Sequence, residues 1–93
     1  MENNKYTLEN FQQEGLPAQE ITFYKLNPDG SYENGTTLEE MLRVSFERLT
    51  DLNSRFPCLE NEDALKGIAV ARERLEARTK DRVARGVEGK HEV

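Results

Sequence analysis

The chain has very few of the side chains that build disulfides, metal centres and nucleophilic active sites. Its 93 residues include one cysteine, Cys58, one histidine, His91, and no tryptophan. A single cysteine cannot form an internal disulfide, and neither residue has neighbours at the spacing of a zinc site. We therefore expect no metal, no cofactor and no His-based catalytic site, with Cys58 a small buried apolar residue.

Long hydrophobic runs and a surplus of basic residues are also absent. No apolar stretch approaches the ~18–20 residues of a membrane span, and no apolar segment near the start resembles a signal peptide, so we expect a cytoplasmic protein that contacts no membrane. The formal net charge is −5. This balance argues against a regulator that binds DNA or RNA, because such proteins need a basic surface.

The charges that are present are unevenly distributed. Residues 1–70 contain 6 Lys and Arg against 13 Asp and Glu, whereas residues 71–93 contain 7 against 5. A small basic element on an acidic body suits a small anion better than a long polyanion. Only 35% of the residues are hydrophobic, and a chain this short buries little surface by itself. We therefore expect a homo-oligomer.

The hydrophobic pattern predicts one small α+β domain, an N-terminal β-hairpin followed by an antiparallel two-helix hairpin. Residues 20–34 surround the sequence PDG at 28–30, which is typical of a hairpin turn. An isolated hairpin is only marginally stable, so it is expected to lie on the helices or on another copy. The predicted boundaries are 1–18 for a polar arm, 20–34 for the β-hairpin, 37–56 and 62–85 for the helices, and 86–93 for a tail.

Both helices carry sequence signals at their ends. Thr37 and Glu40 form a capping box ahead of the first helix, and Pro57 ends it. Asn61 is predicted to cap the second helix, and Gly86 to end it. An interior glycine, Gly67, would be explained by a close approach of the two helices. The predicted apolar stripe of the second helix contains Leu65, Ile68, Ala71, Leu75, Thr79 and Val83.

Arginines four residues apart form a ridge on the second helix, made of Arg74, Arg78 and Arg82, with Arg85 beside them. Like charges at this spacing destabilise a helix by roughly 0.2–0.5 kcal/mol per pair, so an anion should compensate. A bound phosphate is one possibility, since planar guanidinium groups bind phosphate bidentately. The other possibility is a set of carboxylates from the first helix, namely Glu40, Glu47 or Asp51.

Several stretches of the chain resemble a known family. Together they span residues 20–89, and the closing pattern RTxxRxxRGVEG is the most specific of them. The chain resembles the phage and prophage small-protein sponges that defeat nucleotide-signalling immunity, the Thoeris anti-defence sponges and the related anti-CBASS sponges. The stretches are ITFY, NGTT, ERLTDLNSRFPC, EN at 60–61 and LEARTKDRVARGVEG.

The resemblance implies binding without catalysis. Such sponges are symmetric homo-oligomers, dimers assembling toward hexamers, and hold signalling nucleotides between subunits without cleaving them. Thoeris members hold glycocyclic ADP-ribose (gcADPR), whereas some members and the anti-CBASS relatives hold cyclic di- or trinucleotides. The alternative is a structural or protein-interaction hairpin that has no nucleotide ligand and whose arginines pair with acids of another copy.

The resemblance also implies ligand contacts for particular residues. Asn61, Arg78 and Arg82 match positions that the Thoeris group uses on its ligand. An aromatic residue near the end of the first helix commonly stacks on adenine there. Leu52 occupies that register in this chain, and Phe56, four residues later, is expected to stack instead. The candidate ligand-binding residues are Asn61, Arg78, Arg82, Phe56, Arg74 and Arg85.

Overall fold

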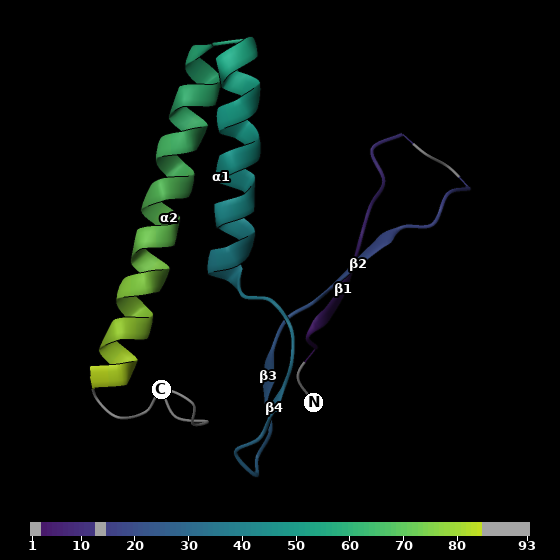
Figure 1. Ribbon diagram of the computed structural model, residues 1–93, viewed down its shortest axis with the longest axis vertical. Helices are drawn as coiled ribbons and strands as arrows, with labels where there is room; N and C mark the ends of the chain where they lie inside the picture. Colours follow the sequence, from purple (N-terminus) through teal and green to yellow (C-terminus); the bar gives the residue numbers. More distant parts are fainter. Residues whose placement is uncertain (1–2, 13–14, 85–93) are drawn as a thin grey trace. The chain divides into compact units, whose positions relative to one another are not determined.

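The computed structural model describes residues 3–12 and 15–84 and has an α+β fold, as predicted (Figure 1). Two antiparallel β-hairpins come first, and two helices follow. The chain divides into two compact units, Met1–Thr37 and Leu38–Val93.

The first strand pair of the β unit lies partly in the segment predicted to be a polar arm. Strand β1, Lys5–Leu8, pairs antiparallel with β2, Gln19–Thr22. The register places Lys5 opposite Thr22 and Leu8 opposite Gln19. The expectation of an arm over 1–18 was therefore wrong for these four residues, because the partner strand lies more than ten residues away and local pattern does not reveal it.

Residues 22–24 form backbone hydrogen bonds with two other segments of the chain. They separate β2 from the rest of the predicted β-hairpin, 20–34. The N–H of Phe23 donates to the carbonyl of Asn4 (2.7 Å), and the N–H of Tyr24 donates to the carbonyl of Thr36 (3.0 Å). The N–H of Thr36 in turn donates to the carbonyl of Thr22 (2.9 Å). The edge-on contact of the Tyr6 and Phe23 rings, 5.7 Å between centroids, adds to this junction.

A second, shorter strand pair encloses the predicted PDG turn. Strand β3, Lys25–Leu26, pairs with β4, Tyr32–Glu33. Gly30 has a φ of 90°, which a residue without Cβ adopts readily, and its N–H donates to the carbonyl of Asn27 (3.0 Å). The turn prediction is therefore confirmed.

The turn predicts a measurable pKa shift at Asp29. The Ser31 hydroxyl (2.6 Å) and N–H (2.9 Å) both donate to its carboxylate, and these hydrogen bonds lower the Asp29 pKa below its ordinary value. A lowered pKa in the folded state stabilises the turn above the unfolded pKa, and this contribution is lost as pH falls through the folded value. NMR titration should therefore show Ser31→Ala raising the Asp29 pKa, whereas Ser54→Ala in the first helix leaves it unchanged. Equal midpoints in the chain and in Ser31→Ala would contradict this account of the turn.

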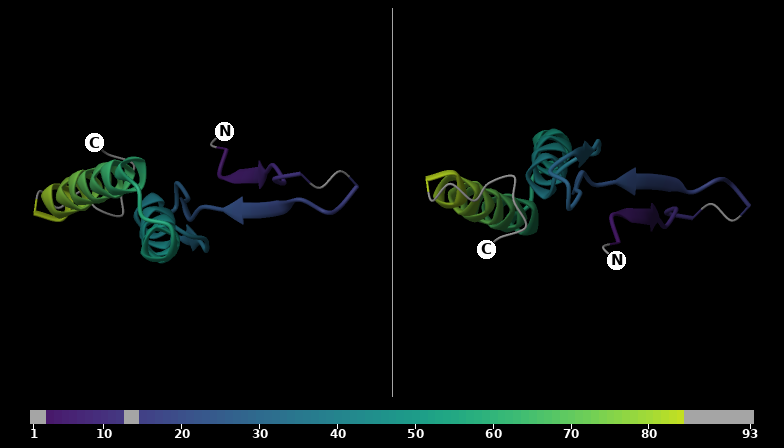
Figure 2. Two further views of the ribbon diagram at one scale, coloured as in Figure 1. Left: turned by 90° about the horizontal axis from the view of Figure 1, so that it is seen from above. Right: turned by 90° about the horizontal axis from the view of Figure 1, so that it is seen from below.

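The helical unit is a hairpin of two helices joined by three residues. Helix α1, Leu38–Arg55, begins directly after Thr37 and ends before Pro57, close to the predicted 37–56. Helix α2 is Leu59–Ala84, and the two helices lie side by side (Figures 1 and 2). The three-residue connection makes them antiparallel.

The second helix begins three residues earlier than predicted, so Asn61 is not its cap. The N–H of Glu62 already donates to the carbonyl of Cys58 (3.2 Å), which places the helix start immediately after Cys58. The N–H of Cys58 donates to the Asn53 side chain (3.1 Å), so the end of α1 satisfies a backbone donor at the start of α2. This pairing outweighs the local preference for asparagine at a cap. The predicted end at Arg85 and Gly86 lies outside the described residues.

The surface along which α1 and α2 contact each other, the seam, is only half-buried. No residue of α1 or α2 is buried, and Cys58 is exposed rather than buried as expected. Gly67 has no atom within 4 Å of where a Cβ would lie, so the predicted close approach of α1 to Gly67 is wrong. Among the described residues, no helix is long and apolar enough to cross a membrane. The half-buried residues of α2 are Asn61, Leu65, Ile68, Arg72, Leu75, Thr79 and Arg82.

Candidate functional site

The far end of α2 extends past the first helix. With 26 residues against 18, α2 is about 12 Å longer than α1 at 1.5 Å per residue. Because the helices are level at the turn, the surplus lies at the C-terminal end of α2, as Figure 1 shows. Arg78 and Arg82 lie on this extension, where α1 no longer runs beside α2.

Two arginines of the ridge are in no ion pair among the described residues. Arg74 and Arg78 are exposed, and neither forms an ion pair with a described residue. Arg82 is half-buried. Arg85 lies outside the described residues. Two guanidinium groups are thus available on the surface to an anion from outside the chain.

Three acids of α1 are engaged with arginines of their own helix. Arg43 donates to Glu40 (2.7 Å) and to Glu47. The hydrogen bond from Arg43 lowers the pKa of Glu40, with smaller contributions from the charges of Arg43 and Arg72. Asp51 pairs with Arg55 at 2.9 Å. The expectation that α1 acids neutralise the ridge therefore fails for Arg74 and Arg78.

The other two predicted contacts lie at the opposite end of the hairpin. Phe56 is in the turn and is 71% exposed, which leaves its ring open to a stacking partner. The Asn61 side chain donates weakly to the Phe56 carbonyl (3.4 Å). Asn61 and Arg78 are separated by about 25 Å along a continuous helix. One copy therefore cannot bring both ends of the predicted site onto one small nucleotide.

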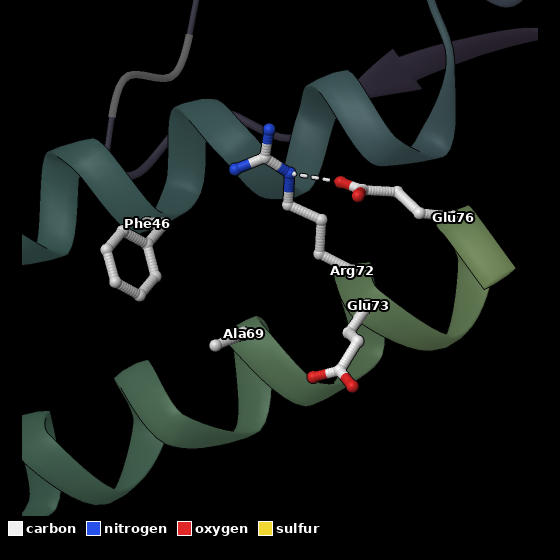
Figure 3. A pocket seen from close by; sticks show the side chains of 5 residues that line it. All are labelled: Phe46, Ala69, Arg72, Glu73 and Glu76. Carbon is white, nitrogen blue, oxygen red and sulfur yellow. Dashed lines mark ion pairs between the residues drawn. The ribbon is translucent and has the colours of Figure 1, made fainter.

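A shallow cavity of about 350 Å³ opens on one flank of the helix pair. Arg72 projects beside it, with its Nε 3.0 Å from Oε1 of Glu76 (Figure 3). Two carboxylates against one guanidinium make this cavity a poor phosphate site. The lining residues are Phe46 of α1 and Ala69, Arg72, Glu73 and Glu76 of α2.

Arg72 is a seam residue that the predicted stripe missed. The predicted stripe contained Ala71 and Val83, but both are exposed, and Arg72 and Arg82 are half-buried instead. The half-buried residues alternate four and three apart, which is the 3.5-residue period of paired helices rather than the 3.6 of a straight one. A seven-residue repeat applied to the sequence would have predicted that Arg72 lies in the seam.

No metal centre adds to this site within residues 3–12 and 15–84, which hold no group of three or more His, Cys, Asp or Glu side chains that could ligate an ion. His91 lies outside these ranges. The candidate site thus consists of the two ends of one helical hairpin, with an exposed aromatic ring at one end and a pair of available guanidinium groups at the other.

Comparison of the sequence with models of known protein families finds no match, and comparison with curated proteins finds none either.

Proposed function

We propose that this protein is a non-enzymatic sponge that binds an immune signalling nucleotide in the cytoplasm of an infected bacterium. The ligand class is gcADPR or a cyclic di- or trinucleotide, and its sequestration would block Thoeris- or CBASS-type defence. The observation that carries the proposal is Arg78, an exposed guanidinium without a carboxylate partner among the described residues of an acidic chain. The family resemblance of the surrounding RTxxRxxRGVEG pattern supplies the ligand class.

The chemistry needed is affinity alone. A phosphate or pyrophosphate loses hydration on binding, so its charge must be met by charged hydrogen-bond donors. Arg78 offers up to five such donors in a planar group that matches phosphate oxygens, and Arg82 lies one helical turn away. A sponge gains nothing from binding a transition state more tightly than its ligand, so no nucleophile or general base is required.

The proposed function requires a homo-oligomer. Phe56 and Arg78 lie at opposite ends of one hairpin, so a pocket that uses both needs two copies. Half-buried apolar residues along α1 and α2 provide the surface for such an assembly. The expected range, taken from the resemblance, is a dimer to a hexamer.

The proposal is tested by binding and release. Calorimetry against gcADPR, a cyclic dinucleotide and a cyclic trinucleotide should identify one tight ligand. Heating the complex and separating the supernatant by chromatography should then recover that nucleotide intact. Recovery of a shortened or linearised product would show that the protein is an enzyme and not a sponge. A lack of binding to every nucleotide of the panel would contradict the nucleotide-binding function.

A protein-interaction hairpin without a ligand is the second candidate. The absence of any buried residue in α1 and α2 favours it, because such helices gain stability from packing against another protein. Under this candidate the arginines are structural, and the assembly dissociates or unfolds when they are removed. Replacing both Arg78 and Arg82 by alanine separates the two candidates, because only the protein-interaction hairpin should then dissociate or unfold.

A further inference from the structure

A chemically reactive pair of residues, an asparagine followed by a glycine, comes directly after β4. Asn34 is the only asparagine of the chain that glycine follows. An asparagine loses ammonia when the next backbone nitrogen attacks its side-chain amide, and glycine favours this attack because it has no Cβ to obstruct it. Every other asparagine precedes a residue with a side chain, and the proline after Asn27 has no N–H at all.

Both reacting groups of this pair are accessible. Asn34 and Gly35 are exposed, and they lie between β4 and α1, in neither element. Among residues 3–12 and 15–84, the Asn34 side chain has no hydrogen-bond partner, and the Gly35 N–H has no acceptor. The Asn34 amide can therefore rotate over the Gly35 nitrogen without breaking a hydrogen bond of the fold.

The same ring closure is hindered at the aspartate–glycine pair of the PDG turn. The Gly30 N–H donates to the carbonyl of Asn27 (3.0 Å), so the nitrogen that would attack is already engaged. Hydrogen bonds from the Ser31 hydroxyl and N–H lower the Asp29 pKa and keep its carboxylate ionised, and an ionised carboxylate has no good leaving group. The fold therefore protects the pair at 29–30 and leaves the pair at 34–35 unprotected.

We propose that Asn34 is a site of spontaneous deamidation in the folded protein, and that the product loosens the β unit. The Gly35 nitrogen gives up its proton and bonds to the side-chain carbonyl carbon of Asn34, while the C–N bond of the amide breaks. The amide nitrogen takes that proton and leaves as ammonia, so a cyclic imide remains. Water then opens the imide at one of its two carbonyl carbons, which yields aspartate or isoaspartate. The reaction needs no ligand and does not depend on nucleotide binding.

The isoaspartate product should disturb the backbone hydrogen bonds of Thr36. Its main chain runs through the former side chain, so it is one carbon atom longer just before Gly35. Gly35 has no room to shift toward the strand beside it, since a Cβ there would lie 2.4 Å from the Phe23 carbonyl carbon. The next residue, Thr36, donates to the Thr22 carbonyl (2.9 Å) and accepts from the Tyr24 N–H (3.0 Å). The longer main chain should therefore displace Thr36 and weaken both hydrogen bonds.

Deamidation is tested by incubating the folded full chain and following the tryptic peptide 26–43 by tandem mass spectrometry. The peptide should gain about 1 Da, located at residue 34. The rate should rise about tenfold per pH unit, because the deprotonated fraction of a weakly acidic N–H does so. In Asn34→Gln the gain should be absent, since the longer side chain closes a larger ring more slowly.

A synthetic peptide with the sequence of residues 26–43 shows how fast the reaction runs without the fold. The folded chain should deamidate within about tenfold of the peptide rate, because no interaction of the fold has to open first. Isoaspartate should form at residue 34 and not at residue 29 of the folded chain. A folded chain that stays unmodified while the peptide deamidates, or that reacts equally at both positions, overturns the proposal.

The effect on the β unit is tested on the isoaspartate form after chromatographic separation. All tyrosines of the chain belong to this unit, so their near-UV CD band reports its unfolding. The isoaspartate form should unfold at a midpoint several degrees lower, with an unchanged helical signal at 222 nm. Asn34→Asp adds the same charge without the longer main chain and should keep the midpoint of the unmodified chain. Equal midpoints for the isoaspartate form and Asn34→Asp would overturn this effect.

Discussion

Exchanging both Arg78 and Arg82 for alanine is expected to weaken nucleotide binding by a factor of roughly 10²–10⁴. Each charged hydrogen-bonding partner contributes about 1.5–3 kcal/mol, and 1.4 kcal/mol is a tenfold change in affinity. Arg78 is exposed, so its removal breaks no ion pair that the structure describes, whereas Arg82 is half-buried and Arg78→Ala alone is the cleaner variant. Titration calorimetry at fixed salt measures the loss.

Lys80→Ala is the matched control for this variant. It removes one positive charge from the same turn of α2, but Lys80 is exposed on the opposite flank from Arg78. A general electrostatic attraction would weaken binding in Lys80→Ala as well, whereas a shaped site would not. The helical CD signal and the solution mass should match those of the unmodified chain in both variants. An unfolded or dissociated double variant would support the protein-interaction hairpin instead.

Replacing Gly35 by alanine is expected to destabilise the β unit by about 1–3 kcal/mol, the usual cost of a steric clash that the structure must relieve. A Cβ there would lie 2.4 Å from the Phe23 carbonyl carbon and 2.5 Å from the Tyr24 nitrogen. These are backbone atoms that hydrogen bonds hold to two other segments of the chain, so they cannot move aside as a side chain does. The β unit buries no residue that the structure describes, and a loss of this size is a large part of its stability.

The chain carries its own probes for this prediction. Its three tyrosines, Tyr6, Tyr24 and Tyr32, all belong to the β unit, and it has no tryptophan. The tyrosine band of the near-UV CD therefore reports on the β unit, and the signal at 222 nm reports mainly on the helices. Gly35→Ala should lower the midpoint of the near-UV transition, while Asn34→Ala, at an exposed neighbour, should not. Identical near-UV transitions for Gly35→Ala and the unmodified chain would show that Gly35 is not packed as described.

Local signals in the sequence predicted the parts of the fold that depend on near neighbours. Thr37 and Pro57 delimit α1, and the PDG turn lies where it was expected, because caps and turns involve residues only a few positions apart. The start of α2 was misplaced because Asn53, on the other helix, accepts the hydrogen bond that precedes it. The pairing of β1 with β2 was missed for a similar reason, since the two strands are distant in sequence.

The sequence by itself determined two long amphipathic helices, the turn between the short strands, and a line of arginines in excess over nearby acids. Tertiary structure alone decided which charges stay unpaired. The α1 acids turn toward Arg43, Arg48 and Arg55, while α2 runs on past α1 and carries Arg78 with it. The reason is geometric: composition sets the number of charges, but the distance between them depends on where helices start, cross and end.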